Sequence, residues 1–203
     1  MRRGTFITVE GVDGAGKSTH LQFIADAADA ASGRHAIVTR EPGGTELAER
    51  LRQAILAEPM TPIIETLLIF AARADHVARV IRPALEAGAW VVCDRFFDAT
   101  VAYQGAGKGV PLELLETLSK AANEGLEPDR TIVFDCSYEV ARQRLDASGK
   151  ALDRFEREDR AFFERVRSAY LARAKTEPQR IRVIDAATDV AQIRKQLERA
   201  LGF

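Results

Sequence analysis

The sequence predicts an α/β fold in which a parallel β-sheet carries helices on both faces. Short apolar runs alternate with segments of helical periodicity along the chain, which is typical of such a sheet. A glycine-rich stretch stands between the first apolar run and the first helical segment, where a phosphate-binding loop would lie. With 203 residues, 46% of them hydrophobic, the chain suits one well-buried core, so we expect a single domain over residues 1–203.

Each expected strand is a short run rich in β-branched or aromatic residues, and four of the five end on an acidic residue. The five runs lie at residues 6–10, 35–39, 90–94, 131–135 and 181–185. Helical periodicity occupies the segments between them, namely residues 21–31, 45–57, 63–86, 112–123, 138–147, 155–175 and 190–201. Glycines and prolines mark the connections, and no linker, repeat or low-complexity tract interrupts the pattern.

Composition narrows the class of protein. The formal net charge of −1 gives no overall field that would attract nucleic acid, so we expect no nucleic-acid partner. Cys93 and Cys136 lie in apolar runs without a C-x-x-C pattern, which favours buried, reduced thiols. No apolar run reaches the roughly 18 residues of a membrane span. We therefore expect a cytoplasmic protein without a membrane partner.

Residues 11–18 read Gly-Val-Asp-Gly-Ala-Gly-Lys-Ser and fit the pattern G-x-x-x-x-G-K-[ST]. In such a loop the backbone N–H groups surround a polyphosphate, and Lys17 adds charge at the β- and γ-phosphates. Ser18 has the hydroxyl needed to ligate Mg²⁺, so the metal is implied together with ATP. The expected ATP-binding residues here are Gly11, Val12, Asp13, Gly14, Ala15, Gly16, Lys17, Ser18 and Thr19. A plain glycine-rich turn is the alternative, but the flanking strand and helix favour nucleotide binding.

Two further strand ends carry candidate functional residues, because ligands of parallel sheets bind at the carboxyl ends of the strands. Residues 40–45, Arg-Glu-Pro-Gly-Gly-Thr, follow the second strand, although an ordinary turn with Thr45 as a helix N-cap would also explain them. Asp94 closes the third strand, where a carboxylate can hold Mg²⁺ directly or through water. Arg95 beside it suits a second phosphate. A strand-end salt bridge is the structural alternative for this pair.

Several longer motifs carry a family resemblance. Residues 39–45, Asp94-Arg95-Phe96 with residues 100–105, and residues 152–156 (Leu-Asp-Arg-Phe-Glu) are similar to motifs of bacterial thymidylate kinases. The resemblance runs in order from about residue 5 to 185. It implies a P-loop NTPase fold, a three-layer sandwich with a sheet of order 2-3-1-4-5. It also implies transfer of the γ-phosphoryl group from ATP to dTMP with Mg²⁺, giving dTDP for dTTP biosynthesis, and a homodimer.

The resemblance also implies roles for single residues. Asp13 would lie near the deoxyribose 3′-hydroxyl, Arg40 and Arg95 would grip the acceptor phosphate, Phe70 would stack on thymine and Arg73 would reach the base edge. The full set implied for dTMP is Asp13, Arg40, Pro42, Phe70, Arg73, Arg95, Thr100, Tyr103 and Gln104. The structural alternatives are a core position for Phe70, a packing role for Tyr103, and solvated positions for Glu41 and His76.

Residues 142–157 are the expected lid, an Arg-rich helix that runs into a polar break containing Gly149. Such a flap closes over the transferring phosphoryl group and excludes water. Because the phosphate loop carries Gly14 rather than Arg, the resemblance implies that lid cations assist catalysis. Ser148 stands where relatives often have Arg, so the expected catalytic set is Lys17, Arg95, Lys150 and Arg154, with Arg144 contributing at ATP.

Two other functions remain open from the residues alone. A deoxynucleoside kinase would need a carboxylate base for a hydroxyl acceptor, and Glu10 or Asp94 could supply it. A nucleotide-switched P-loop ATPase module would need a water-positioning residue and a switch segment. Neither a Gln after the third strand nor an Asn-Lys-x-Asp motif points to that module.

Overall fold

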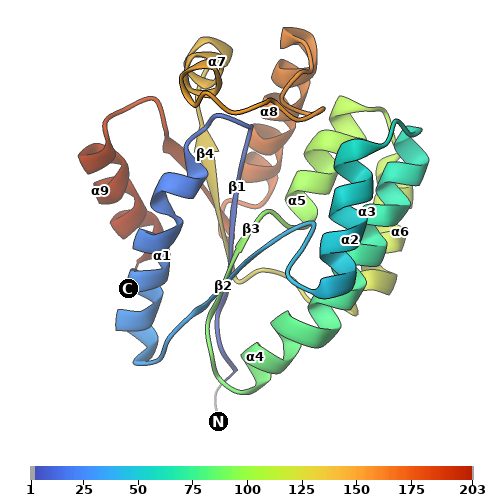
Figure 1. Cartoon of the computed structure of the whole chain (residues 1–203). Coiled ribbons are helices and arrows are strands. Elements are labelled where there is room, and N and C mark those ends of the chain that lie inside the picture. The colour runs from blue at the N-terminus through green and yellow to red at the C-terminus, as the bar shows by residue number, and fades with distance from the viewer. Residues whose placement is uncertain (1–2, 203) are drawn as a thin grey trace.

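The fold is a five-stranded parallel sheet with helices on both faces, as seen in the computed structural model of the chain, which describes residues 3–202 (Figure 1). The described strands are β1 (Phe6–Gly11), β2 (Ile37–Arg40), β3 (Val91–Asp94), β4 (Arg130–Asp135) and β5 (Ile181–Asp185). Their order in the sheet is β2-β3-β1-β4-β5. The predicted fold class and strand order are therefore confirmed.

The first strand lies at the centre of the sheet. β1 pairs in parallel with β3 on one side and with β4 on the other, and all of its residues are buried. Its one polar side chain that meets a neighbouring strand, Thr8, shares a hydrogen bond of 2.7 Å with Thr131 of β4. A run of β-branched and aromatic residues suits a strand covered on both faces. The glycine-rich loop that follows β1 therefore starts from the middle of the sheet.

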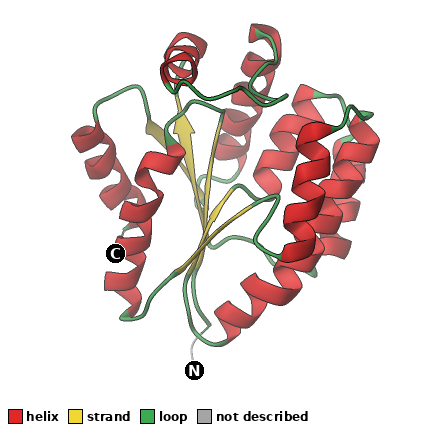
Figure 2. Cartoon of the chain, viewed as in Figure 1, coloured by secondary structure: helices red, strands yellow, loops and turns green. Residues whose placement is uncertain are grey.

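Helices cover the two faces of the sheet (Figure 2). The described helical segments are α1 (Lys17–Ser32), α2 (Glu46–Ala57), α3 (Pro62–His76), η1 (Val77–Ile81), α4 (Arg82–Glu86), α5 (Phe97–Thr100), η2 (Val101–Gly107), α6 (Leu112–Asn123), α7 (Tyr138–Ala147), α8 (Arg160–Thr176) and α9 (Val190–Leu201). α1 and α9 pack together on one face, while α5 and α8 lie on the other, beside α2, α3 and α6. Among the described residues no helix has the length and apolar character that a membrane crossing needs.

The long helix expected over residues 63–86 is present, with a change of winding inside it. α3, η1 and α4 follow one another without a break, and η1 is a π-helical segment. Pro83 stands at the start of α4 and has no backbone N–H, so a regular α-helical ladder could not pass through it unchanged. Val77, Ile81 and Leu85 of this helix pack against Phe6 of β1.

Three expected boundaries were wrong. The segment expected as a helix over residues 155–175 begins only at Arg160, because Asp153 accepts hydrogen bonds from the N–H groups of Phe155 and Glu156 and forms a turn. Asp159 then caps α8 by accepting from the N–H of Phe162 at 2.7 Å. α1 begins at residue 17, inside the phosphate-loop motif, and β2 begins at residue 37 rather than 35.

α5 and η2, which follow β3, were not predicted from the sequence. This segment contains Thr100, Tyr103 and Gln104, all of which are buried. Its sequence, Phe-Asp-Ala-Thr-Val-Ala-Tyr-Gln-Gly-Ala-Gly, shows neither the alternation of a strand nor a long apolar helical stripe. Cys93 and Cys136 are free and buried, as predicted, and burial raises the pKa of both thiols.

Candidate active site

The loop after β1 surrounds a cavity at the carboxyl ends of the strands. Gly11, Gly14 and Gly16 all have positive φ angles, and a Cβ atom on Gly14 would lie 2.4 Å from the carbonyl oxygen of Ala141. Only glycine fits there, because the loop touches the backbone of α7 and needs a left-handed conformation. All loop residues from 13 to 18 line the cavity, together with Thr19. The geometry is that of a phosphate-binding loop opening a helix.

Lys17 lies over this loop. Its Nζ donates to the carbonyl oxygens of Gly11 at 3.0 Å and Val12 at 3.1 Å. An ammonium group has three donors, so one remains for a ligand oxygen. Burial lowers the pKa of Lys17, and the cation of Arg95 adds to that effect, while Asp94 and Asp13 oppose it. The carbonyl oxygens of the loop thus hold the Lys17 side chain in place, beside the N–H groups of the same loop that are available to a phosphate.

Asp94 and Ser18 line the same cavity and fit a magnesium ion. Asp94 Oδ1 is buried without a hydrogen-bond partner, which is unusual for a carboxylate oxygen unless another ligand uses it. Within residues 3–202 no group of three or more His, Cys, Asp or Glu side chains could hold a metal alone. Mg²⁺ commonly takes one or two protein ligands and completes its shell with phosphate oxygens and water. The two residues therefore fit a metal brought in with a nucleotide.

Arg95, Asp13 and Tyr103 form a closed set of contacts between the phosphate loop and η2. Arg95 Nη2 donates to Asp13 Oδ1 at 2.5 Å and to the Tyr103 hydroxyl at 3.1 Å. The Tyr103 hydroxyl in turn donates to Asp13 Oδ2 at 2.8 Å, and the Arg95 guanidinium lies 4.6 Å from the Tyr103 ring centre. Burial acts to raise the pKa of Asp13, but Arg95 and Lys17 outweigh it, and the pKa lies below its usual range.

The backbone of Arg95 supports this position. Its φ angle is 72°, a conformation that costs a residue with a side chain free energy. Its N–H donates to the carbonyl oxygen of Val9 at 2.9 Å, which continues the contact between β3 and β1 past the end of the strand. The tight turn aims the guanidinium back across the sheet edge toward the phosphate loop. Arg95 therefore forms its ion pair with Asp13 of the phosphate loop, and not with Asp94, the neighbour proposed as its salt-bridge partner in the structural alternative.

A second cavity lies beside the phosphate-loop cavity. Arg73, Thr100, Tyr103, Gln104 and Pro42 line it, so five residues expected at dTMP lie together there with Asp13 and Arg95. Apolar side chains of α2 and α3 complete the wall; they are Ile55, Leu56 and Ile69. The mixture of an apolar wall with a few buried polar groups is typical of a small-molecule site.

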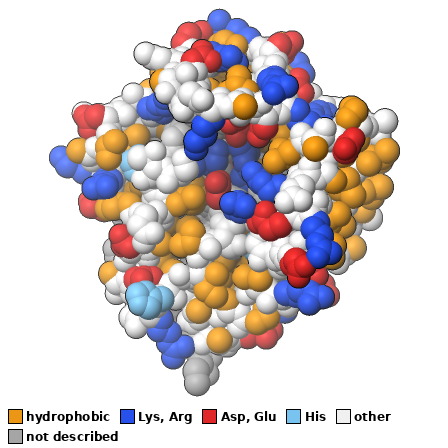
Figure 3. Space-filling view, in the orientation of Figure 1, with side chains coloured by type: hydrophobic (Ala, Val, Ile, Leu, Met, Phe, Trp, Pro, Cys, Tyr) orange, Lys and Arg blue, Asp and Glu red, His pale blue; other side chains and the backbone are white. Residues whose placement is uncertain are grey.

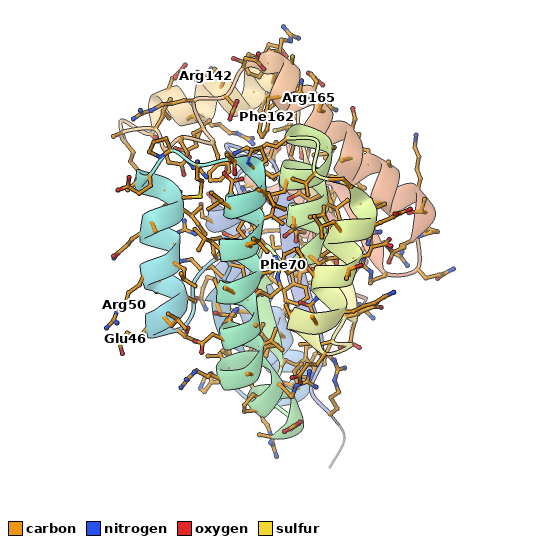
Figure 4. The ribbon with its side chains drawn as sticks, turned by 90° about the vertical axis from the view of Figure 1, so that its right-hand side faces the viewer. Glu46, Arg50, Phe70, Arg142, Phe162 and Arg165 are labelled. Carbon is orange, nitrogen blue, oxygen red and sulfur yellow. The ribbon has the colours of Figure 1, made fainter. Side chains whose placement is uncertain are left out.

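Phe70 and Arg73 take different positions relative to this second cavity. Arg73 lines it, whereas the Phe70 ring is buried against Val110 and Leu115 between α3 and α6 (Figure 4). The residue of α3 that lies at the wall one turn before Arg73 is Ile69. The stacking role of Phe70 therefore stays a prediction, and the structure gives its ring the core position that was the alternative.

Arg40 and Arg52 lie at the phosphate-loop cavity, but in different ways. Arg40 is more than half exposed and pairs with Glu49 of α2 at 2.9 Å. Arg52 was not expected from the sequence. It lines both cavities, and its Nη1 donates to the carbonyl oxygen of Pro42 at 3.0 Å. Burial lowers the pKa of Arg52, and the nearby cation of Arg40 lowers it further. Because the two positive charges repel each other, an anion bound between them would be stabilised.

The lid segment places its two expected catalytic cations apart. Lys150 lines the phosphate-loop cavity. Arg154 instead reaches α3, where it donates to the buried carboxylate of Glu65, and its guanidinium lies 4.8 Å from the centre of the Phe155 ring. Phe155 lines the second cavity and was not expected there from the sequence.

Arg144 connects α7 to the nucleotide side of the site. It donates to the carbonyl oxygen of Ala15 at 3.2 Å and to that of Ala186, after β5, at 2.8 Å. Thr188, Val190 and Ile193 line the same cavity, although nothing in the sequence singled them out. They stand where the chain passes from β5 into α9, and only the fold shows that this turn lies beside the phosphate loop.

The two cavities meet at a shared set of residues. Asp13, Glu41, Arg52, Arg95 and Asp153 line both of them. Figure 3 shows Lys and Arg side chains gathered in a hollow below the lid, in the upper half of the molecule. Two anionic groups bound in the two cavities would therefore face each other across arginine side chains, as transfer of a phosphoryl group requires.

Comparisons with known proteins agree with this arrangement. The family model described as thymidylate kinase matches residues 9–197. A thymidylate kinase of Cupriavidus necator is 54% identical over 201 residues, covering 98% of each chain. One from Bordetella petrii is 54% identical over 199 residues, covering 98% of this chain and 95% of the relative.

A solved structure extends the agreement to three dimensions. The crystal structure of thymidylate kinase from Ehrlichia chaffeensis superposes with a TM-score of 0.80 at 31% identity and covers 99% of both chains. These matches cover at least 95% of each relative, so they include the phosphate loop, both cavities and all five strands. The chain belongs to the thymidylate kinase family.

Proposed function

We propose that this protein transfers the γ-phosphoryl group of ATP to dTMP, giving ADP and dTDP. The observation that carries the proposal is the meeting of the two cavities at Asp13, Arg52 and Arg95. ATP would lie along the phosphate loop, and dTMP would lie in the second cavity with its phosphate toward the arginines. ATP and dTMP are named as the two substrates because the relatives described above are thymidylate kinases.

On the donor side, the backbone N–H groups of the loop and Lys17 would hold the β- and γ-phosphates. Ser18 and Asp94 would hold Mg²⁺, which offsets phosphate charge during transfer. Arg144 and the residues that begin α9 would hold the remainder of the nucleotide. Each of these groups lines one continuous cavity, which supports a single binding mode.

On the acceptor side, Arg95 is the residue best placed for the phosphate, because it is partly buried, fixed by Asp13 and Tyr103, and shared by both cavities. Arg52 and Arg40 would add charge there. Asp13 would contact the sugar, while Arg73, Thr100 and Gln104 would contact the base. A nucleotide phosphate is already anionic at neutral pH, so the attack needs positioning and charge stabilisation rather than a strong base.

A buried carboxylate bears on the deoxynucleoside kinase alternative. Glu10 was one of two candidate bases for a hydroxyl acceptor. It is fully buried below the site, where it accepts from the N–H of Phe96 at 2.7 Å and from the hydroxyl of Tyr170 at 2.8 Å. It lines neither cavity. The remaining candidate, Asp94, is the proposed metal ligand, so the geometry favours a phosphate acceptor.

The test is an acceptor panel in which ADP release is measured with ATP and Mg²⁺. We expect turnover with dTMP and little with thymidine or purine deoxynucleoside monophosphates. Faster turnover with thymidine than with dTMP would favour a nucleoside kinase. ATP hydrolysis that ignores added dTMP would favour a switch module. Repeating the assay with EDTA tests the proposed Mg²⁺, whose removal should abolish turnover. Sedimentation and cell fractionation would test the homodimer and the cytoplasmic location that we also propose.

A further inference from the structure

Glu41 is a buried carboxylate at the wall of the proposed acceptor cavity. It follows β2 directly, is 3% exposed, and lines both cavities. A solvated position was the structural alternative for Glu41 and for His76, and it is wrong for both, because both side chains are buried. A buried carboxylate is costly unless it is paired and hydrogen-bonded, so its partners indicate its purpose.

Its main partner is Arg73 of α3. Glu41 Oε2 accepts from Arg73 Nε at 2.6 Å, and both side chains are almost completely buried. The other oxygen, Oε1, lies 3.0 Å from Nδ1 of His76, whose Nε2 lies 2.7 Å from the Thr39 hydroxyl. An ionised carboxylate only accepts hydrogen bonds, so Nδ1 of His76 is the donor. His76 and Thr39 thus hold Glu41, and Glu41 holds Arg73.

The guanidinium of Arg73 is fixed on three sides. Nη2 donates to the Thr100 hydroxyl at 2.9 Å, and the rings of Phe70 and Phe96 each have their centres 5.0 Å from the guanidinium carbon. Nη1 is the exception. It is buried and has no hydrogen-bond partner, although the side chain lines the cavity. A buried donor without a partner is rare and indicates a place for a ligand atom.

The charge of the pair decides what kind of atom fits there. Glu41 and Arg73 neutralise each other. Nearer the phosphate loop, Glu49 pairs with Arg40, whereas Arg52 donates to a backbone carbonyl oxygen, so Arg40, Arg52 and Glu49 together keep one excess positive charge. Nη1 of a neutralised arginine suits a neutral carbonyl oxygen better than a phosphate oxygen. The base of dTMP presents carbonyl oxygens, and a cytosine ring carries an amino group where thymine has its 4-oxo group.

We propose that Glu41 is a positioning residue for base selection: it orients and neutralises Arg73 so that Nη1 is presented to the 4-oxo group of the acceptor base. This inference rests on the proposed function and extends it to a residue that does not itself touch the base. It assigns the residue after β2 to specificity, although its position beside the phosphate loop would have favoured a role in phosphate binding.

The test compares dTMP with 5-methyl-deoxycytidine monophosphate, which keeps the methyl group, sugar and phosphate but has a 4-amino group. Glu41→Gln should raise the KM for dTMP by roughly ten- to a hundredfold, with a much smaller change in kcat and none in the KM for ATP. The acceptor preference, which is the kcat/KM for dTMP divided by the kcat/KM for 5-methyl-deoxycytidine monophosphate, should fall by a similar factor. A merely structural role would lower activity with both acceptors and leave their ratio unchanged.

A double-mutant cycle with Arg73→Met tests whether Glu41 acts through Arg73. In that background Glu41→Gln should change the acceptor preference little. If the two effects multiply instead, or if folded E41Q keeps the wild-type preference, the inference is wrong. Glu46→Gln is the matched control, because Glu46 pairs with Arg50 on the exposed outer side of α2 (Figure 4). It should leave KM, kcat and preference unchanged.

A second variant keeps the test decisive if E41Q does not fold, which circular dichroism would reveal. Thr100→Val removes the other anchor of Arg73 and leaves the ion pair in place. Its preference for dTMP should fall in the same direction by roughly tenfold. An unchanged preference would overturn the inference. In the Arg73→Met background Thr100→Val should change the preference little, which separates this effect from a direct contact of Thr100 with the base. Wild-type enzyme inactive with dTMP would overturn the proposed function instead, so the two failures are distinguishable.

Discussion

Arg154 of the lid donates to the buried carboxylate of Glu65 in α3. The same carboxylate accepts from Lys108 at 2.8 Å and from Nε2 of Gln104 at 2.7 Å. Glu65 therefore joins the lid to a side chain that lines the acceptor cavity. This contact ties the position of the lid to the wall of the acceptor site.

We expect the contact between Arg154 and Glu65 to be energetically significant, because one partner is buried. In a double-mutant cycle of Glu65→Gln and Arg154→Met, the coupling in free energy of unfolding should be about 1 to 3 kcal/mol. Urea unfolding of the four proteins measures it. The same cycle on Arg142 and Asp146, an exposed pair within α7, should give less than about 0.5 kcal/mol. Equal couplings would show that burial of Glu65 adds nothing.

Arg95→Ala should lower kcat with dTMP by roughly a hundred- to a thousandfold, the usual effect of losing one well-placed charged donor at a transferring group. Arg95 is fixed by Asp13 and Tyr103, so water cannot replace it in the same geometry. Steady-state ADP release measures the loss. Arg50→Ala, at an exposed position of α2, is the control and should turn over normally. Near-normal turnover of the Arg95 variant would remove this residue from the mechanism.

Lys150 and Arg154 should differ in their effects on catalysis. Lys150→Ala is expected to lower kcat by about a hundredfold, because Lys150 lines the phosphate-loop cavity. Arg154→Ala should have a much smaller effect on kcat, because its guanidinium is engaged by Glu65. Single-turnover measurements at saturating ATP and dTMP separate this effect from product release. A larger loss in the Arg154 variant would mean that the lid rearranges before transfer.

Glu10 should make the stability of the protein depend on pH. Burial, with a further contribution from Asp98, raises the pKa of Glu10 from 4.5 to about 8. Between these values the folded state keeps a proton that the unfolded state has lost. The free energy of unfolding should therefore fall by up to about 1.4 kcal/mol per pH unit as pH rises from 5 to 8. Below and above that window Glu10 should add no further change of stability with pH.

Glu10→Gln isolates this effect, because the amide can accept from the N–H of Phe96 and donate to the hydroxyl of Tyr170. The difference in melting temperature between the variant and the wild type should grow in favour of the variant from pH 5 to pH 8. Differential scanning calorimetry across this range measures it. A difference that stays constant with pH would show that Glu10 is ionised in the folded protein at neutral pH.

The main features of the fold were accessible from sequence, because they depend on local patterns. Central strands such as residues 6–10 are short runs rich in apolar and β-branched residues, and an amphipathic helix such as α9 shows its period directly. Turn chemistry was harder to place. Asp153 and Asp159 move the start of α8 to Arg160 through side-chain hydrogen bonds that a periodicity argument does not count.

The sequence by itself determined the phosphate loop and the polar residues that directly follow β2 and β3, because each of these features depends on residues adjacent in the chain. Tertiary structure decided which distant side chains meet. It gave Arg52 a place in both cavities, turned Phe70 into the core, and buried Glu41 against Arg73. These outcomes depend on which face of a helix a side chain occupies and on what the neighbouring element leaves uncovered. Neither property is a function of local sequence, since both arise only when α2, α3 and η2 pack together at one edge of the sheet.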